Sequence, residues 1–209
     1  MGRDRKGTLL TIGERLFAQH GYREVSIKDV TNAAGLGMGS FYTYFPSKEA
    51  FYSEILDAIE ARGFAEVQKR VNSLRSPLFK LRALFRSTAL SLRNNEILRG
   101  ISSGEKRYRY PGLEERSQKS TTLFARIEVL LREILEEGTS SGAFRTSLFH
   151  DPTRMLIAIF SAVPLAAQGK EAEKLTDDVM MLVERGLRRW LRFRQRDERL
   201  DVRARRRDG

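Results

Sequence analysis

The chain has 209 residues, enough for one compact domain or two small ones with a buried core. Its 38 Lys and Arg against 27 Asp and Glu give a formal charge of +11, which suits nucleic acid or an anionic membrane surface as a partner. The absence of Cys excludes disulfides, thiolate catalysis and thiolate metal sites.

The positive charge is concentrated at the carboxyl end of the chain. Residues 185–209 hold 11 Arg against four Asp and Glu, a balance of +7. Residues 1–50 hold 7 Lys and Arg against 5 Asp and Glu, a balance of only +2. Charge alone would therefore place a nucleic-acid contact in the tail, so a DNA-binding surface elsewhere has to be inferred from the pattern of residues.

Hydrophobic stretches are too short for a membrane span. The longest, residues 155–167, is interrupted by Ser161 and Pro164 and falls short of the roughly 20 residues that a span needs. Residues 1–6 lack the apolar core of a secretory signal, so we expect a cytoplasmic protein with no membrane partner. His20 and His150 are isolated in the sequence, so we expect no metal site.

Apolar residues recur at helical spacing along almost the whole chain, which predicts an all-α fold. The first three expected helices run from about Leu9 to Gly21, from Ser26 to Gly35 and from Met38 to Tyr44. Ser26 with Asp29 three residues later is a variant of the capping box. Phe41 and Phe45 are expected on the buried side of the third helix.

Longer helices are expected in the remainder of the chain. They run from Lys48 towards Val71, from Pro77 to about Asn95 and from Leu123 to Leu135, with a less regular region at residues 96–112 and a loop at residues 138–149. Asp151 and Pro152 are expected to begin a helix that is apolar on all sides, as suits burial between two neighbours. The last expected helix extends from Leu175 to Leu191.

This pattern predicts three parts. Residues 1–48 would form a helix-turn-helix DNA-binding domain, and residues 49–195 a helical domain for ligand binding and dimerisation. Residues 196–209 would form an Arg-rich tail without fixed structure.

The third helix can enter a major groove only if its outward face is slim and its inward aromatics fix it to the first two helices. Gly37, Gly39 and Ser40 supply the slim face, and Phe41 with Phe45 supplies the fixation. Groups suited to the phosphates of double-stranded DNA surround this helix: Ser26, Lys28, Tyr42, Tyr44 and Lys48.

Residues 16–30 (LFAQHGYREVSIKDV), 33–36 (AAGL), 39–45 (GSFYTYF) and 47–49 (SKE) together resemble the amino-terminal signature of TetR-family repressors, over about residues 9–56. The resemblance implies a homodimer joined by its last two helices, a palindromic operator, and release of DNA when a small-molecule effector binds. It implies base-reading positions at Gly37, Met38, Gly39, Ser40, Tyr42 and Thr43. It implies phosphate-binding positions at Ser26, Tyr42, Tyr44 and Lys48.

Met38 departs from the family pattern, because many relatives carry Lys or Arg there. Few side chains of this helix can then make bidentate hydrogen bonds to a base. We expect specificity to depend on Tyr42, Thr43, methyl contacts and DNA shape.

The segment from Arg62 to Gly169 holds the apolar side chains for an effector cavity. The candidates are Phe64, Phe79, Phe85, Ile101, Tyr108, Phe124, Ile127 and Phe160. Each could equally be core, and periodicity does not separate the two. A largely hydrophobic effector with one polar group is expected, with no cofactor. No nucleophile and base pair is recognisable, so no enzymatic activity is expected.

Alternatives remain open at this stage. The Arg-rich carboxyl end could make the protein a non-specific, architectural DNA binder. The run of Arg and Tyr at residues 107–110 could stack on single-stranded bases, or form a loop at the pocket edge. Pro164 within a helix could mark a functional bend or only a packing adjustment.

Overall fold

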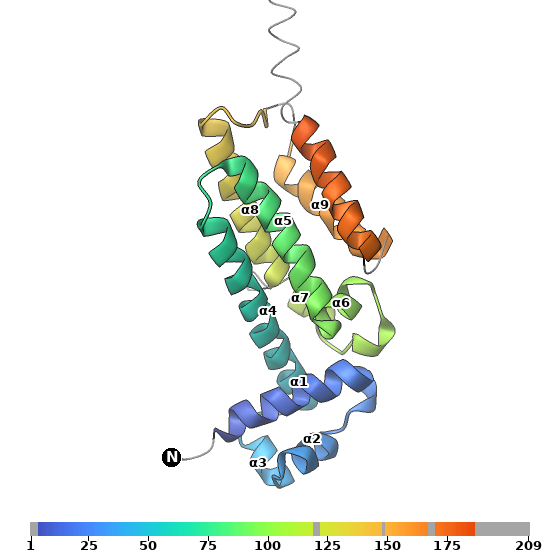
Figure 1. Cartoon of the computed structure of the whole chain (residues 1–209). Helices are drawn as coiled ribbons and strands as arrows, with labels where there is room; N and C mark the ends of the chain where they lie inside the picture. Colours follow the sequence, from blue (N-terminus) through green and yellow to red (C-terminus); the bar gives the residue numbers. More distant parts are fainter. Residues whose placement is uncertain (1–3, 119–121, 148, 167–169, 187–209) are drawn as a thin grey trace, which may run out of the picture.

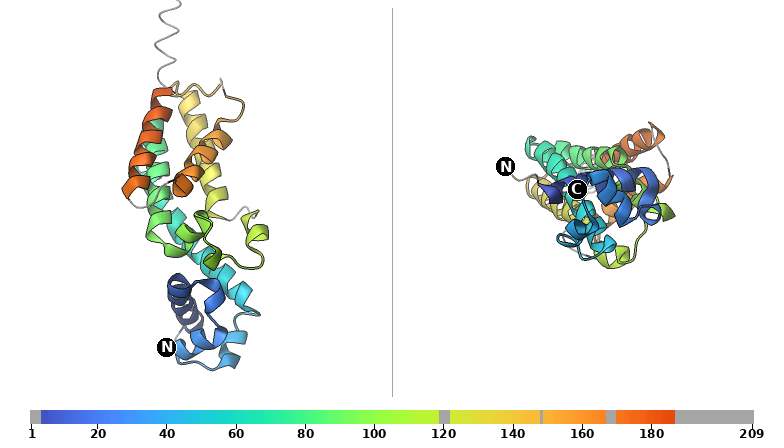
Figure 2. Two further views of the ribbon diagram at one scale, coloured as in Figure 1. Left: turned by 90° about the vertical axis from the view of Figure 1, so that its right-hand side faces the viewer. Right: turned by 90° about the horizontal axis from the view of Figure 1, so that it is seen from below.

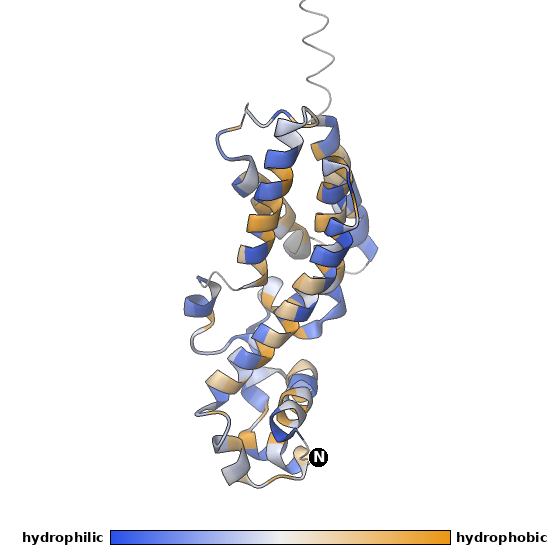
Figure 3. Ribbon diagram, turned by 90° about the vertical axis from the view of Figure 1, so that its left-hand side faces the viewer, coloured by the Kyte–Doolittle hydropathy of each residue, from blue (hydrophilic) through white to orange (hydrophobic). Residues whose placement is uncertain are grey.

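The structure, a computed structural model, describes residues 4–118, 122–147, 149–166 and 170–186. All regular secondary structure in these ranges is helical, which confirms the expected fold class. The molecule is elongated, with α1, α2 and α3 forming a head at one end and the other helices stacked beyond it as a body (Figure 1). Each long helix carries both hydrophobic and hydrophilic residues (Figure 3).

The first helix, α1 (Arg5–Glu24), is interrupted at Gly21, as its sequence predicts. Gly21 has φ 81° and ψ 171°, a conformation open essentially to glycine alone. A Cβ at this position would also meet the carbonyl oxygen of Arg107, so the backbone of the body approaches α1 closely here. The short turn after Gly21 carries Tyr22 into the core.

The second helix, α2 (Ile27–Ala34), begins with the expected capping box. Ser26 Oγ accepts from the Asp29 N–H at 3.1 Å, and Asp29 Oδ2 accepts from the Ser26 N–H at 2.8 Å. Gly35, at φ 64°, ends the helix. The third helix, α3 (Met38–Tyr42), is two residues shorter than expected, because the N–H groups of Tyr44 and Phe45 both bond the carbonyl of Phe41 in a tight turn.

Aromatic side chains hold the head together. Phe41 and Phe45 are buried, as expected, and pack against Phe51 at ring-centroid distances of 5.1 and 4.7 Å. Phe17 of α1 joins the same cluster at 5.9 Å from Phe51. Because Phe51 belongs to α4 (Lys48–Asn72), the first turns of α4 are part of the core of the head, and the rest of α4 runs into the body.

The body consists of α4, α5 (Pro77–Asn94), α6 (Glu96–Ser102), the 3-10 turn η1 (Lys106–Tyr108), α7 (Leu113–Ser117), α8 (Leu123–Ser140), α9 (Pro152–Ala166) and a final helix at residues 170–186. Helices α4, α5 and α8 pack together, and α9 and the final helix lie on one side of them (Figures 1 and 2). In the described ranges no helix combines the length and hydrophobicity required to cross a bilayer.

Two expected boundaries differ from the structure. Helix α8 continues to Ser140, so the expected loop from residue 138 begins only at 141. Gly138 stays in the helix because it is buried against the ring of Phe144, and this packing offsets the low helix propensity of glycine. The less regular region at residues 96–112 contains α6 and η1.

Helix α9 begins at Asp151 and Pro152 as expected, with Asp151 Oδ1 accepting from the Arg154 N–H at 2.9 Å. The expectation that α9 is buried on all sides is wrong for the single chain. Met155 and Ile159 are exposed, because α9 packs on α6 and α8 on one side only. Trp190 and Leu191, expected in the last helix, lie outside the described residues.

The η1 turn joins head to body. Tyr108 is fully buried, and its hydroxyl donates to the carbonyl of Ala18 in α1 at 3.0 Å. The Tyr52 hydroxyl of α4 donates to the Tyr108 carbonyl at 3.3 Å. Residues of α1, α4 and η1 are therefore linked by buried hydrogen bonds, and a displacement of one is resisted by the others.

Candidate DNA-binding interface and effector cavity

In α3 and the turn that follows it, exposed and buried side chains alternate around the backbone. Met38, Tyr42 and Tyr44 are 44%, 53% and 39% exposed, whereas Phe41 and Phe45 point into the core. Gly37 and Gly39 are exposed, and a Cβ at either would meet no atom within 4 Å. Glycine is therefore not required for packing at these two positions, and the outward face of α3 is open.

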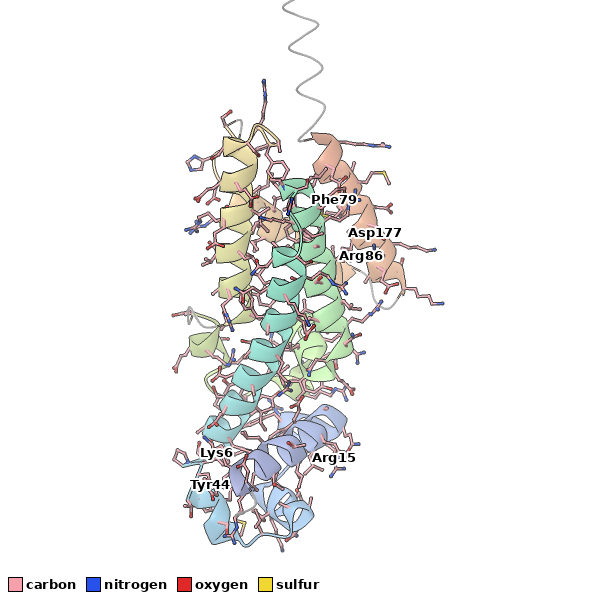
Figure 4. The ribbon with its side chains drawn as sticks, turned by 60° about the vertical axis from the view of Figure 1, so that its left-hand side comes forward. Lys6, Arg15, Tyr44, Phe79, Arg86 and Asp177 are labelled. Carbon is pink, nitrogen blue, oxygen red and sulfur yellow. The ribbon has the colours of Figure 1, made fainter. Side chains whose placement is uncertain are left out.

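All ten residues predicted to contact DNA lie in the head or at the start of α4. Eight are exposed: Ser26, Lys28, Gly37, Met38, Gly39, Tyr42, Thr43 and Tyr44. Ser40 and Lys48 are half-buried. Figure 4 shows Tyr44 at the side of the head.

Some of these residues already make hydrogen bonds within the head. Thr43 Oγ1 donates to the Gly39 carbonyl at 3.0 Å, and Met38 Sδ accepts from Thr31 Oγ1 at 3.7 Å. Ser26 Oγ is held in the capping box. Within the described part of the chain, the hydroxyls of Tyr42 and Tyr44 make no hydrogen bond, so both can donate to a ligand.

Lys48 is positioned by neighbours that the sequence did not single out. Its Nζ lies 4.3 Å from the centroid of the Tyr22 ring and 3.5 Å from the carbonyl oxygen of Arg23. Tyr22 in turn donates to Glu49 Oε1 at 2.5 Å. Burial lowers the pKa of Lys48, and the hydrogen bond from Tyr22 lowers the pKa of Glu49.

Lys6 is a second positioned lysine of the head, beside Lys48, and the sequence analysis did not single it out. Its Nζ lies 2.6 Å from Glu54 Oε1 and 5.5 Å from the centroid of the Phe45 ring. The only sequence signal was its place in the basic run at residues 3–6. The contacts of Lys6 and Tyr22 join residues far apart in the chain, which periodicity does not predict.

The body contains a cavity of about 870 Å³ that is partly open to solvent and is lined by side chains of α4 to α9 and the final helix. Five of the eight candidate residues line it: Phe85, Ile101, Phe124, Ile127 and Phe160. The rings of Phe85 and Phe160 stack with centroids 3.5 Å apart and so connect α5 to α9 at the cavity wall. Leu92, Leu98, Leu123 and Ile157 also line it and were not predicted.

Three candidates do not line the cavity, which corrects the expectation. Phe64 is buried, with the Arg126 guanidinium 3.9 Å from its ring centroid. Phe79 is 53% exposed on the outer surface of α5 (Figure 4). Tyr108 is buried between η1 and α1. Apolar residues at helical spacing can serve any of these roles, because spacing does not reveal what faces them.

Arg116 is a charged residue of the cavity wall and is 4% exposed. Its guanidinium donates to both oxygens of Glu60 at 3.1 Å and to Asp57 Oδ1 at 2.6 Å. Glu60 Oε2 also accepts from the Leu123 N–H at 3.0 Å. One buried group thus links α7, α4 and the start of α8.

Other arginines of the lining differ from Arg116 in their exposure. Arg70, Arg86 and Arg99 are exposed, and Arg93 pairs with Glu173 of the final helix. Arg86 of α5 and Asp177 of the final helix both line the cavity and lie where these helices face each other (Figure 4). The part of the chain that the structure describes places no three His, Asp or Glu side chains together as a metal site.

Comparison with known proteins agrees with this geometry. Residues 9–55 match the family model of bacterial regulatory proteins, tetR family. The HTH-type transcriptional repressor KstR2 of Mycobacterium tuberculosis is 27% identical over 149 residues, covering 69% of this chain and 71% of that protein.

Solved structures share the fold. The transcriptional regulator FadR from Bacillus subtilis, in complex with stearoyl-CoA, has a TM-score of 0.69 at 17% identity over 87% of this chain and 98% of that one. A TetR/AcrR regulator from Thermobifida fusca has a TM-score of 0.70 at 19% identity over 89% of this chain and 100% of that one. The matched head, the relatives and the shared architecture lead to one conclusion: residues 9–55 carry the DNA-binding segment of the tetR family, and the whole chain resembles DNA-binding transcriptional regulators.

Proposed function

We propose that this protein is a ligand-responsive repressor that acts in the cytoplasm, binds a palindromic operator as a homodimer and leaves DNA when a largely hydrophobic effector fills the cavity. The observation that carries the proposal lies in α3 and the turn after it. Phe41 and Phe45 are buried and fix the helix, whereas Gly39, Tyr42 and Tyr44 are exposed. This division is what a recognition helix in a major groove requires.

In this proposal, residues 1–48 form the DNA-binding head. Bases are read by Gly37, Met38, Gly39, Ser40, Tyr42 and Thr43. Phosphates are bound by Ser26, Lys28, Tyr42, Tyr44 and Lys48. The free hydroxyls of Tyr42 and Tyr44 support their part in this set, and the Tyr22 ring and the Arg23 carbonyl hold Lys48 in place for a phosphate.

Residues 49–195 form the ligand-binding and dimerisation domain in the same proposal. The exposed apolar side chains of α9 and the final helix support a dimer through these two helices: Met155, Ile159, Met181 and Leu182. Two copies related by a two-fold axis would bury these side chains against each other and present two heads to successive major grooves.

The cavity volume of about 870 Å³ lies within the usual range for small-molecule sites, and its rings and aliphatic side chains suit an apolar effector. The FadR structure that shares this fold carries stearoyl-CoA, and KstR2 of Mycobacterium tuberculosis is a ketosteroid transcriptional regulator. Both support an effector with a large apolar part. Helix α4 contributes to both the cavity wall and the core of the head. A shift of α4 on effector binding would therefore move the head and change the distance between the two heads of the dimer. A coupling of about 1–3 kcal/mol between effector and DNA is the usual scale.

The test is selection of bound sequences from a random DNA pool with the full-length protein, followed by salt titration of the selected site against scrambled DNA. A palindrome bound about 10³-fold or more better than scrambled DNA supports the proposal. Deletion of residues 196–209 should then keep the preference and lower only the salt dependence. Equal binding of all sequences, lost on this deletion, would instead establish the non-specific, tail-driven DNA binder.

A further inference from the structure

The outward face of α3 has no side chain that can make a bidentate hydrogen bond to a base. Residues 33–47 contain no charged and no amide side chain, so the pairings of Arg with guanine and of Asn with adenine are closed to α3. The hydroxyls of Ser40 and Tyr42 remain, but a hydroxyl can both donate and accept, so it discriminates weakly between bases. Sequence-specific binding by α3 therefore needs another kind of contact.

Met38 offers hydrocarbon to a base. Its side chain is 44% exposed, and its Sδ lies 3.7 Å from the hydroxyl oxygen of Thr31, a residue of α2 that is buried. The sulfur is thus placed against α2, and the other atoms of the side chain are methylene and methyl groups. A thioether has no hydrogen to donate, so Met38 can meet a base only through apolar contact and a weak acceptor.

Thr43, which follows α3, offers a methyl group. Its Oγ1 donates to the Gly39 carbonyl at 3.0 Å, so the hydroxyl proton is used within the last turn of α3. Thr43 is exposed, and its γ-methyl group takes no part in that bond. Gly37 and Gly39 have no side chain and open space beside them, so the backbone of α3 can come close enough to the base edges for such short groups to reach them.

Thymine carries the group that these side chains fit. In the major groove its C5 methyl group distinguishes it from the other three bases, and apolar side chains recognise it by contact. We propose that α3 reads thymine: Met38 and Thr43 contact C5 methyl groups, and the operator carries T·A pairs where these two side chains meet it. This inference rests on the proposed function, because it requires α3 to lie in the major groove of a specific operator.

The test removes single methyl groups from the DNA. In the palindrome selected from the random DNA pool, each thymine is replaced in turn by uracil, symmetrically in both half-sites, which deletes only the C5 methyl group. The full-length wild type, Met38→Ala and Thr43→Ser are titrated with each duplex. Thr43→Ser deletes the γ-methyl group and keeps the hydroxyl. Ser40→Ala is the matched control, because it removes a hydroxyl from the same helix and no methyl group.

We expect uracil to weaken binding of the wild type by about fourfold for each methyl group lost at the thymines that meet Met38 and Thr43. One of these penalties should fall below about twofold in Met38→Ala and the other in Thr43→Ser, because the contact is already absent. Ser40→Ala should keep both penalties. At the same positions, 5-methylcytosine should be bound about fourfold better than cytosine, since it restores the methyl group in a C·G pair.

Other outcomes overturn the inference and are distinguishable from failure of the proposed function. A palindrome that is bound specifically but shows no uracil penalty would exclude thymine reading while the repressor proposal stands. Penalties that are equal in the wild type, Met38→Ala and Thr43→Ser would show that the methyl groups act through DNA shape or another residue. If no sequence is selected from the pool, the proposed function fails and the inference fails with it.

Discussion

At the scale of single residues, Phe41 and Tyr42 are neighbours with opposite tasks. The Phe41 ring is fully buried among Phe45 and Phe51, whereas the Tyr42 ring is half in solvent and its hydroxyl makes no bond in the described ranges. Phe41 therefore fixes α3 to the head, whereas Tyr42 is placed to contact DNA.

Tyr42→Ala should weaken binding to the selected operator by about 1–3 kcal/mol per subunit. It should lower the free energy of unfolding by only about 1 kcal/mol, through loss of the edge-on contact of the Tyr42 ring with the Phe41 ring at 5.4 Å. Phe41→Ala should lower the free energy of unfolding by about 3–5 kcal/mol, because it leaves a void in the ring cluster. Urea denaturation and DNA titration of both variants check this. A Tyr42→Ala protein that binds the operator like the wild type would remove Tyr42 from the interface.

The Tyr22–Glu49 hydrogen bond makes part of the stability of the head depend on pH. Burial raises the pKa of Tyr22, so its phenol stays protonated and donates, and this bond lowers the pKa of Glu49. A carboxyl group whose pKa is lowered in the folded state stabilises that state above its unfolded pKa, about 4.3, and this stabilisation is lost as pH falls through the folded pKa.

Tyr22→Phe should therefore destabilise the protein at pH 7, and its difference from wild type should shrink as pH is lowered below about 4. Urea denaturation of both proteins across this range measures the difference. Glu49→Gln is the control, since it removes the titrating group and should flatten the same pH dependence. A difference that does not change with pH would show that the Tyr22 hydroxyl does not act through the Glu49 carboxylate.

At the scale of elements, the contact between α1 and η1 depends on the backbone of Gly21. This residue has a positive φ, and the Arg107 carbonyl occupies the space where a side chain would begin. The contact places the buried Tyr108 of the body against the carbonyl of Ala18 in the head. The close approach of α1 and η1 thus depends on a residue without a side chain.

Gly21→Ala should lower the free energy of unfolding by about 1–3 kcal/mol, because alanine is strained at this φ and clashes with the body. Gly39→Ala is the matched control, since Gly39 is helical, exposed and surrounded by open space. Gly39→Ala should not lower stability but should weaken DNA binding, because a methyl group would stand between α3 and the bases. Thermal unfolding and DNA titration separate the two effects, and a Gly21→Ala protein as stable as wild type would argue against the close approach.

At the scale of the whole molecule, the body offers an apolar surface that the single chain does not cover. Leu182 is 70% exposed on the final helix, and Ile159 is exposed on α9. Val129, on α8, is exposed as well but lies on a different helix of the body. If α9 and the final helix form the dimer interface, Ile159 and Leu182 contact the second copy and Val129 stays exposed to solvent.

Ile159→Glu combined with Leu182→Glu should convert the protein to a monomer in sedimentation experiments, because four carboxylates would be buried in one interface. Val129→Glu should remain dimeric. The double variant should also bind the full palindrome more weakly, since each head then binds its half-site independently. A dimer that survives the double variant would exclude this pair of helices as the interface.

The sequence by itself determined the long helices, several of their caps and which side chains of α3 are buried. Ser26 with Asp29, Gly35, and Phe41 with Phe45 act through neighbours a few residues away, so local spacing is enough to predict them. The same local pattern produced the resemblance to the TetR family.

Only the tertiary structure decided which apolar residues line the cavity and which charged residue is buried there. Phe85 and Phe64 have similar helical surroundings in sequence, but Phe85 stacks on Phe160 at the cavity wall and Phe64 lies against Arg126. Arg116 meets Glu60 across 56 residues of chain and Lys48 meets Arg23 across 25. Helical periodicity states which side of a helix is inward, but whether a side chain, a charge or empty space lies opposite is fixed by the packing of distant helices.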